Sequence, residues 1–456
     1  MVASAIGGAA TIADPSASKL DFAQRVLVGA TAQGLVRFDS AGGIEPGLAE
    51  RWIVIDDGRS YIFRLREAHW GDGTEVTAGQ VVRSIRRSAA ERSRNALAPY
   101  LAVIDQVVEM TPQIIEVRLK QPRPDLLKLF AQPELAVLRP RGRDGSGPFR
   151  AQPSGGGVLL HAVDQTYASE DASTPASRSL RLFGERAAVA IARFRAGQSD
   201  LILGGRFTDW PIATSVGLNP ANLRIDPAQG LFGLAVVRRE GFLADAGNRA
   251  AVSMAIDRAR LTQALMPNWT PSETLLPAQL DSAVPPALST WSIMTQGDRR
   301  AAARARVALW RRTHPGPMEV RIALPTGPGA TLLWGHLAEA MLRIGLTPVR
   351  VAIDAPAELR LLDEVAPYDS GRWYVNTACV ACSPEAAALI AAGREAPSLT
   401  ERAQRIAEAD AALTRDAAFI PLAQPLRWSA VALRLDAWQR NTRAWHPLNH
   451  LRNDRE

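Results

Sequence analysis

The sequence predicts a mixed α/β protein with more than one lobe, and three observations support this. The chain has 456 residues, more than a single hydrophobic core usually fills, so two or three lobes are expected. Residues 31–82 read as successive β-hairpins that lead into a capped helix. Residues 318–353 read as strand, helix and strand with short links, which predicts a parallel βαβ unit.

The hairpin stretch contains two short apolar strands, at residues 52–55 and 61–65, joined by a polar turn. Thr77 and Gln80 have the spacing of a capping box, so a helix should begin near Ala78. None of these residue types in this pattern indicates catalysis. The stretch therefore informs us about the fold more than about chemistry.

Hydrophobic periodicity predicts the later elements in turn. Residues 114–119 alternate between apolar and polar side chains, as a strand does, and the glycines at 155–157 mark a hairpin turn. Residues 231–237 form a continuous apolar run, typical of a buried strand. One helix is expected over residues 245–265. Further helices are expected at 298–312 and 400–414.

The predicted βαβ unit follows a proline-rich stretch. Residues 318–324 alternate as a strand, and residues 332–344 carry apolar side chains at helical spacing. Gly345 should end that helix because glycine readily adopts the left-handed conformation of a helix C-terminus. Residues 349–353 then form the next strand.

Composition favours an ordinary globular protein. Hydrophobic residues make up 47% of the chain and charged residues 22%. No run of about 18 apolar residues predicts a membrane-spanning helix. Of the 53 basic residues only Lys19, Lys120 and Lys128 are lysines. The arginines are spread along the chain rather than clustered, which favours a compositional bias over nucleic-acid binding.

Several short motifs occur in a distinctive order along the chain. They are PGLAERW at residues 46–52, DG at 57–58, FRLR at 63–66, DGT at 72–74, GSGPFR at 145–150 and NRAAVSMAIDR at 248–258. In this order they resemble the family 5 solute-binding proteins of ABC importers, the binders of dipeptides, oligopeptides and nickel. The resemblance extends over nearly the whole chain.

The resemblance implies a two-lobed, three-domain periplasmic binding protein fold, type II or cluster C-like, with a ligand cleft between the lobes. It also implies the division of the chain. Lobe I would comprise residues 1–32, 149–238 and 426–456, an additional α+β domain residues 33–148, and lobe II residues 239–425.

The function implied is that of an extracytoplasmic receptor of an ABC transporter. It would capture a peptide or similar small polar solute by lobe closure and deliver it to a membrane permease, as a monomer without a cofactor. A cytoplasmic ligand-sensing domain of a regulator is the alternative, although no helix-turn-helix is visible. A hydrolase is a third hypothesis. The N-terminus has neither a positive nor an apolar signal region, so a periplasmic location would require a signal removed or a start assigned too late.

The resemblance places candidate ligand-binding residues in both lobes. Thr31 and Gln33 match the first-lobe segment that lines the family's cleft, with an exposed loop as the alternative. Residues 368–384 match the strand segment that precedes the carboxylate holding a peptide's amine. Here the expected aspartate falls on Asn376 or Ala378, and neither carries charge, so an ordinary free-amine peptide is disfavoured.

Three neighbours of Asn376 complete the second-lobe candidates. Arg372 is a candidate ligand contact, and Trp373 and Tyr374 are candidate stacking walls, with core packing as the alternative. Asp369 is expected to start a strand rather than to replace the missing carboxylate.

The two cysteines of the chain, Cys379 and Cys382, lie in the same segment. A disulfide between them would rigidify the rim of the cleft in an oxidising compartment. Two free thiols in a loop are the alternative. A redox-active Cys-x-x-Cys site is less favoured, because the thioredoxin-like context is missing.

The remaining motifs give no support for metal or catalytic chemistry. The six histidines show no zinc-protease spacing. His446 and His450 are four apart, but Pro447 breaks the helix that such a pair needs. No Gly-x-Ser-x-Gly elbow is present. We therefore expect no enzyme, no cofactor, no metal site and no nucleic-acid partner.

Overall fold

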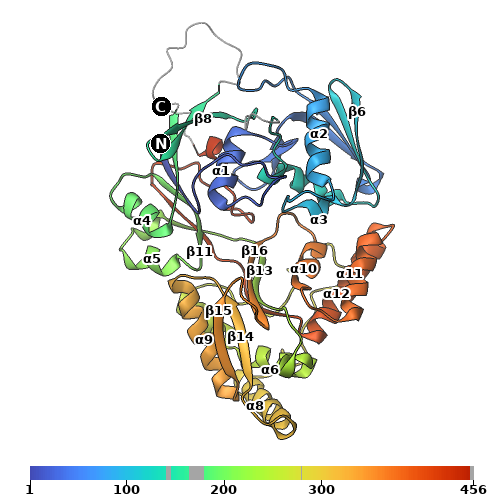
Figure 1. The fold of residues 1–456 in the computed structure, drawn as a ribbon, viewed down its shortest axis with the longest axis vertical. Helices are drawn as coiled ribbons and strands as arrows, with labels where there is room; N and C mark the ends of the chain where they lie inside the picture. The colour runs from blue at the N-terminus through green and yellow to red at the C-terminus, as the bar shows by residue number, and fades with distance from the viewer. Residues whose placement is uncertain (140–144, 164–178, 279, 452–456) are drawn as a thin grey trace. The chain divides into compact units, whose positions relative to one another are not determined.

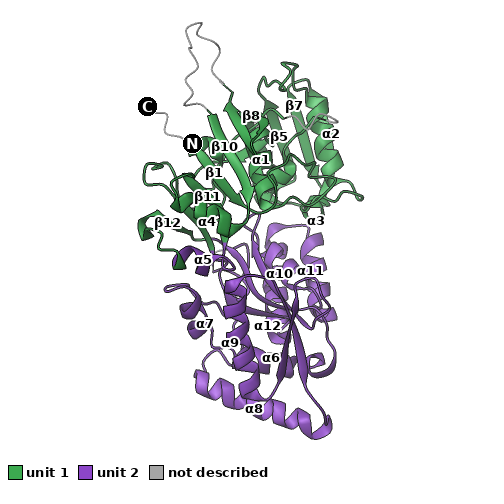
Figure 2. Ribbon diagram, turned by 60° about the vertical axis from the view of Figure 1, so that its left-hand side comes forward, with its two compact units in different colours: residues 1–205, 215–227, 427–456 green, residues 206–214, 228–426 purple. Residues whose placement is uncertain are grey.

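The computed structural model describes residues 1–139, 145–163, 179–278 and 280–451. The chain divides into two compact units (Figure 2). Unit 1 comprises Met1–Gly205, Ser215–Pro227 and Arg427–Glu456, and unit 2 comprises Arg206–Thr214 and Ala228–Leu426. Each unit is described by itself below.

Unit 1 is built on a seven-stranded sheet with the order β12-β18-β11-β1-β10-β9-β8. Strand β1 lies near its centre and pairs in parallel with β10 and β11, whereas β8 and β9 form the antiparallel hairpin predicted at the glycine turn. The strand bounds are β1 (Val2–Ile6), β8 (Phe149–Ser154), β9 (Gly157–Ala162), β10 (Ser179–Glu185), β11 (Leu201–Arg206), β12 (Leu223–Asp226) and β18 (Arg427–Val431).

Helix α1 (Phe22–Thr31) packs against this sheet (Figure 1). It begins with a capping box, in which the Asp21 side chain accepts from Gln24 N and the Gln24 side chain accepts from Asp21 N. Its buried face joins the strands' apolar side chains in one core. Helix α4 (Ala187–Arg195) and the short segments η5 (Pro220–Asn222) and η7 (Leu448–His450) complete this part.

A second, four-stranded antiparallel sheet in unit 1 confirms the predicted hairpins. Its order is β4-β5-β7-β6, with bounds β4 (Ala49–Ile55), β5 (Ser60–Leu65), β6 (Ile104–Thr111) and β7 (Ile114–Leu119). Helix α2 (Ala78–Ala89) begins with the predicted Thr77–Gln80 capping box. Smaller elements of this region are β2 (Val36–Phe38), β3 (Ile44–Pro46), η1 (Asp56–Gly58), α3 (Ala98–Leu101), η2 (Pro124–Ala131) and η3 (Pro133–Leu135).

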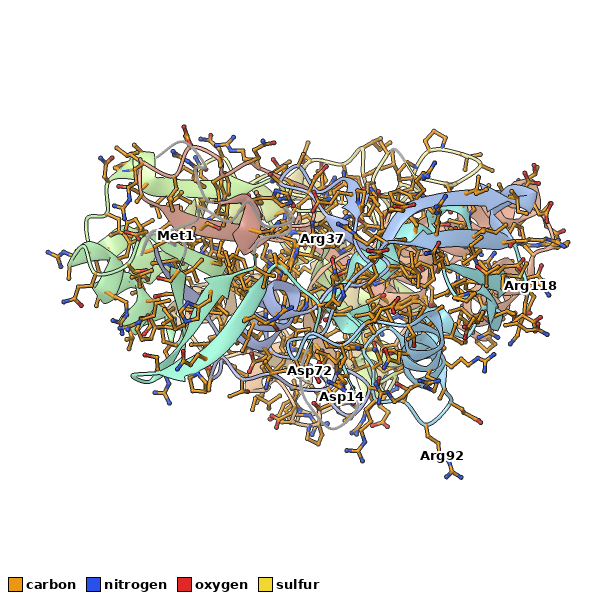
Figure 3. The ribbon with its side chains drawn as sticks, turned by 90° about the horizontal axis from the view of Figure 1, so that it is seen from above. Met1, Asp14, Arg37, Asp72, Arg92 and Arg118 are labelled. Carbon is orange, nitrogen blue, oxygen red and sulfur yellow. A yellow bond between two sulfur atoms is a disulfide. The ribbon has the colours of Figure 1, made fainter. Side chains whose placement is uncertain are left out.

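Two arginines of unit 1 reach the surface at separate places. Figure 3 shows Arg92 and Arg118 extending outward from different elements, and Arg118 pairs with Glu116 at 2.7 Å. This distribution agrees with the spacing of arginines along the sequence. Among the described residues, no helix combines the length and the apolar character that crossing a membrane requires.

Unit 2 contains a five-stranded sheet with the order β15-β14-β16-β13-β17. Strand β14 (Glu319–Leu324), helix α9 (Pro328–Ile344) and strand β15 (Thr347–Ala352) form the predicted parallel βαβ unit. Gly345 ends α9 with φ 91°, a conformation that favours glycine. The other strands are β13 (Gly230–Val236), β16 (Leu359–Val365) and β17 (Phe419–Ala423).

Strand β13 lies in unit 2, although the sequence analysis placed it in lobe I. The reason is its pairing, because β13 is antiparallel to both β16 and β17. The separate domain predicted for residues 33–148 is not divided from unit 1, although those residues carry the second sheet. The division into three domains therefore stays a prediction.

Helices surround the unit 2 sheet, and one prediction about them was wrong. The single helix expected over residues 245–265 is two helices, because Asp257 caps the second by accepting from Arg260 N at 3.1 Å. The helix bounds are α5 (Trp210–Ser215), α6 (Ala246–Ala255), α7 (Arg258–Leu265), α8 (Gln296–Thr313), α10 (Gly371–Ala378), α11 (Pro384–Glu395) and α12 (Leu399–Asp416), with η6 (Gly241–Ala244) before α6.

Candidate functional site

The two first-lobe candidates lie at and just beyond the end of α1, and both are buried. Thr31 is its last residue, and its hydroxyl donates to the carbonyl of Leu27 at 2.9 Å. Gln33 forms an antiparallel β-bridge with Val137, and its amide nitrogen donates to Ser146 O at 2.7 Å. The exposed-loop alternative is therefore wrong for both residues, each of which is 4% exposed.

The GSGPFR segment packs directly on this helix end. A Cβ atom added to Gly145 would lie 2.5 Å from the Cβ of Ala32, and one added to Gly147 would lie 2.5 Å from the carbonyl carbon of Thr31. Gly147 N also donates to Thr31 O at 2.9 Å. The predicted tight crossover thus requires glycine because two backbone segments approach each other closely.

Thr31 borders a cavity in unit 1, whereas Gln33 borders another. The first has a volume of about 600 Å³. Leu27 and Thr31 of α1 and Gly145 of the GSGPFR segment contribute to its wall. The second, which Gln33 lines, is about 30 Å³, a space for no more than one or two water molecules. The structure thus separates these two candidates.

The second-lobe candidates lie on helix α10 rather than on the predicted strand. Ser370 caps this helix, since its hydroxyl accepts from Arg372 N at 3.3 Å. Asp369 precedes the cap in a bend, so its assignment as the start of a strand was also wrong. A serine cap, followed after Gly371 by seven residues without glycine or proline, is what the sequence analysis missed here.

Helix geometry sorts the candidates by face. Arg372 and Asn376 are four residues apart and share one side of α10, whereas Tyr374 lies on another. Asn376 is exposed. Trp373 and Tyr374 are 4% and 1% exposed, and their rings form an edge-to-face pair at 4.9 Å. In the structure these two rings pack in the interior, as the core-packing alternative expects.

A polar cluster fixes the beginning of α10. The carboxylate of Asp281 accepts from Gly371 N at 2.6 Å and from the Ser370 hydroxyl at 3.1 Å. Arg402 of helix α12 donates to the same carboxylate at 2.9 Å and to the Ser370 hydroxyl at 2.7 Å. Sequence reasoning did not find Asp281 and Arg402, because both come from segments far from α10 in the chain.

Two polar groups of α10 have no hydrogen-bond partner among the described residues. The guanidinium of Arg372, in a residue only 7% exposed, makes no hydrogen bond or ion pair there. The hydroxyl of Tyr374 likewise has no hydrogen-bond partner, and burial raises the pKa of this phenol.

The disulfide candidate lies where α10 ends. The structure joins Cys379 and Cys382 in a disulfide with their Cα atoms 5.0 Å apart. The loop that they close is tied to the sheet, because Ala381 N donates to Val236 O at 3.2 Å.

Two histidines near the end of the chain contact carboxylates. His446 contacts the buried carboxylate of Asp226 at 3.0 Å, and His450 contacts Glu45 at 2.9 Å. Within the described ranges, no group of three histidine, cysteine or acidic side chains is placed to hold a metal ion.

Comparison with known proteins adds to this geometry. The sequence profile described as "Bacterial extracellular solute-binding proteins, family 5 Middle" matches residues 43–305, more than half of the chain. A probable deoxycholate-binding periplasmic protein of Escherichia coli, YgiS, is 26% identical over 54% of this chain and 52% of its own length. The periplasmic oligopeptide-binding protein OppA of Salmonella typhimurium is 26% identical over 50% of this chain and 47% of its own. The chain thus aligns with about half the length of these relatives.

Solved structures resemble the whole chain. The murein tripeptide binding protein MppA of Escherichia coli has a TM-score of 0.81 at 18% identity, covering 98% of this chain and 96% of its own. OppA of Haemophilus influenzae, in complex with the peptide RPPGFSPFR, has a TM-score of 0.80 at 15% identity, covering 97% of both chains. These likenesses establish the fold, which is the predicted α/β fold of two-lobed periplasmic binding proteins.

Proposed function

Because the chain belongs to the bacterial extracellular solute-binding proteins, family 5, we propose that it is an extracytoplasmic receptor of an ABC transporter. It captures a peptide or similar small polar solute and delivers it to a permease in the membrane. The family match over residues 43–305 carries this proposal, and the likeness of the whole fold to solved peptide-binding proteins supports it.

The same family match favours the receptor over a cytoplasmic sensor, because the family is described as extracellular. A periplasmic location, a monomeric state and the absence of enzymatic activity, of a cofactor and of a nucleic-acid partner are parts of this proposal. The dispersed arginines support the last of these, since nucleic-acid binding usually needs a basic patch.

Capture by lobe closure follows from the family resemblance. A ligand that contacts both lobes binds more tightly to the closed form, and it therefore shifts the population towards closure. The closed form is then what a permease would recognise.

Among the candidates, Thr31, Arg372 and Asn376 are those we propose to face the ligand. Thr31 borders the cavity of about 600 Å³, Asn376 is exposed, and the Arg372 guanidinium lacks a partner within the described chain. Gln33, Trp373 and Tyr374 are buried, and we assign them to the support of the ligand-facing residues.

Native extraction tests the proposed function. The protein is purified without denaturation, and small molecules released from it by organic solvent are identified by mass spectrometry. A receptor is expected to release one solute, or one chemical class, in near-stoichiometric amount. The same protein, stripped in denaturant and refolded, should bind that solute again, with a raised midpoint of thermal unfolding. Turnover of the solute by the purified protein would contradict the proposal.

A further inference from the structure

Arg372 is a buried cation that the described part of the chain does not neutralise. It is 7% exposed, and its guanidinium forms no hydrogen bond or ion pair within those residues. Removing a charged group from water without a compensating partner is costly, so buried arginines normally find carboxylates or carbonyl oxygens. The Arg372 nitrogens are not among the side-chain atoms that are both closed to solvent and without a partner, so an acceptor from outside the described residues can reach them.

The acidic side chain at the beginning of the same helix is already paired. Helix α10 lies beside α12 in unit 2 (Figure 1). The Asp281 carboxylate at the start of α10 is taken by Arg402, which is 2% exposed, at 2.9 Å, and by Gly371 N at 2.6 Å. One arginine, Arg402, thus pairs with this carboxylate, whereas the Arg372 guanidinium has no partner in the described residues.

Asn376 extends the same face of the helix towards solvent. It lies one turn after Arg372, is exposed and carries an amide that donates hydrogen bonds. The two side chains together offer a positive charge and several donors. A group that fills this face must supply acceptors, and a carboxylate or another oxyanion matches the fork of a guanidinium best.

We propose that the ligand carries net negative charge and presents a carboxylate or another oxyanion to Arg372 and Asn376. The proposal rests on the function proposed above, because it names the class of solute that the same receptor takes. A free ammonium group would meet like charge at this face and is excluded from it.

The first test determines whether Arg372 contributes to the stability of the ligand-free protein. Arg372→Gln and the matched control Arg402→Gln are stripped of ligand in denaturant and refolded, and their thermal unfolding is compared with that of stripped wild type. The unfolding midpoint of Arg372→Gln is expected to equal or exceed that of wild type. The midpoint of Arg402→Gln is expected to fall, because the substitution removes the ion pair between Arg402 and Asp281. A fall for Arg372→Gln as large as that for Arg402→Gln would show a structural role and overturn the proposal.

The second test identifies the charge of the ligand. A small-molecule extract of bacterial cells is separated at pH 7 into a pool held by an anion exchanger, a pool held by a cation exchanger and an unretained pool. Only the first, acidic pool is expected to raise the unfolding midpoint of stripped wild type. Arg372→Gln should need about 10- to 100-fold more of that pool for half of the shift, and Arg372→Lys should lie between the two.

The outcomes separate this proposal from the one on which it rests. A shift caused only by the cationic or the unretained pool overturns the anionic ligand and leaves the receptor function in place. An equal response of wild type and Arg372→Gln to the acidic pool also overturns the role of Arg372 alone. If no pool shifts wild type and native extraction releases no solute, both proposals are overturned.

Discussion

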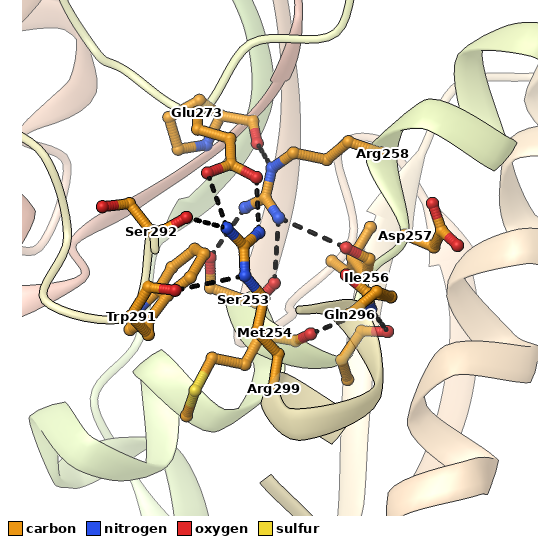
Figure 4. Close-up of polar contacts among 12 residues, drawn as sticks. Ser253, Met254, Ile256, Asp257, Arg258, Glu273, Trp291, Ser292, Gln296 and Arg299 are labelled. Carbon is orange, nitrogen blue, oxygen red and sulfur yellow. Dashed lines mark hydrogen bonds and ion pairs between the residues drawn. The ribbon is translucent and has the colours of Figure 1, made fainter. Parts of the chain in front are cut away.

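Two groups of buried arginines in unit 2 differ in how their charge is compensated. Around Glu273, Arg258 and Arg299 direct their donors at several acceptors (Figure 4). Arg258 donates to Pro421 O at 2.7 Å and to the Ser253 hydroxyl at 2.8 Å, and Arg299 donates to both oxygens of Glu273. On α10, Arg372 is similarly buried but has no such acceptor within the described residues.

The contrast shows what a structural arginine requires in this chain. Even with Glu273 nearby, burial lowers the pKa of Arg258 to about 10. Burial therefore disfavours the charged form of this side chain, although its nitrogens donate hydrogen bonds. The indole of Trp291 adds a cation–π contact to Arg299 at 4.7 Å. An arginine buried without comparable compensation is therefore better explained by a ligand than by stability.

The largest effect is expected from the compensated group. Arg258→Met should lower the free energy of unfolding by about 3 kcal/mol, since it leaves the buried carbonyl of Pro421 and the Ser253 hydroxyl without donors. Urea unfolding followed by circular dichroism measures this change. A loss no greater than that of Arg372→Met would remove the distinction between the two groups.

A buried acid on α12 extends the comparison to negative charge. Asp410 is 1% exposed, one of its oxygens accepts from Ala287 N at 2.8 Å, and the other has no partner in the described residues. Burial raises the pKa of this carboxyl to about 6. The folded state therefore holds the proton more tightly than the unfolded chain, whose pKa is about 4.

The sign of the resulting pH dependence is determined by that difference. The contribution of the Asp410 carboxyl to the free energy of unfolding is complete below about pH 4 and is lost as the pH rises through about 6. Asp410→Asn should therefore flatten the decline between these values and stabilise the protein at pH 7.5 by about 2–3 kcal/mol. Urea unfolding at a series of pH values measures this change. A decline in the free energy of unfolding that persists in the variant would contradict this assignment.

Arg402 offers a test of intermediate size. Its partner Asp281 keeps 32% of its side-chain exposure, so water can take over part of the lost hydrogen bonding. Arg402→Gln should cost about 2 kcal/mol of stability. Hydrogen exchange of α10 amides would sharpen the result, since a loosened helix start should exchange faster in the variant than in wild type.

The smallest effect is expected from the disulfide. Cys379 and Cys382 are three positions apart, and a bond that closes so short a loop restricts the unfolded chain by only about 1–2 kcal/mol. Thiol titration in denaturant should find no free thiol before reduction and two after it. Two free thiols in protein secreted to an oxidising compartment would rule out the bridge.

Local patterns in the sequence predicted most of the fold. The Thr77–Gln80 capping box, the glycine turn between β8 and β9 and the βαβ unit ending at Gly345 all depend on residues near each other in the chain. The break at Asp257 between α6 and α7 was missed because the apolar side chains keep a helical spacing on both sides of the cap, as they would in one continuous helix. Strand β13 falls in unit 2, and not with the segment that the sequence assigned to lobe I, because it pairs with strands more than 100 residues away.

The candidate site was less predictable. The segment of Arg372 and Asn376 was found because it departs from the family pattern, but its helical state was not. The lack of a partner for the Arg372 guanidinium could not be inferred from sequence, since it depends on which side chains the packing of distant segments brings near it. Whether a given arginine finds a counter-ion is a property of three-dimensional packing.

The position of β18 in the unit 1 sheet bears on the order in which this protein folds. Strand β18 lies between β12 and β11, so its residues, Arg427–Val431, join segments made some 200 positions earlier. This sheet cannot be completed while the ribosome still holds the last part of the chain. Unit 2 ends at Leu426, directly before β18, and its strand β13 likewise pairs with a distant strand, β17, as Phe232 does with Ala423. We expect both units to fold late and slowly, because each has strand pairings that are distant in sequence, and a chain that stops before Arg427 would leave β12 without a neighbour.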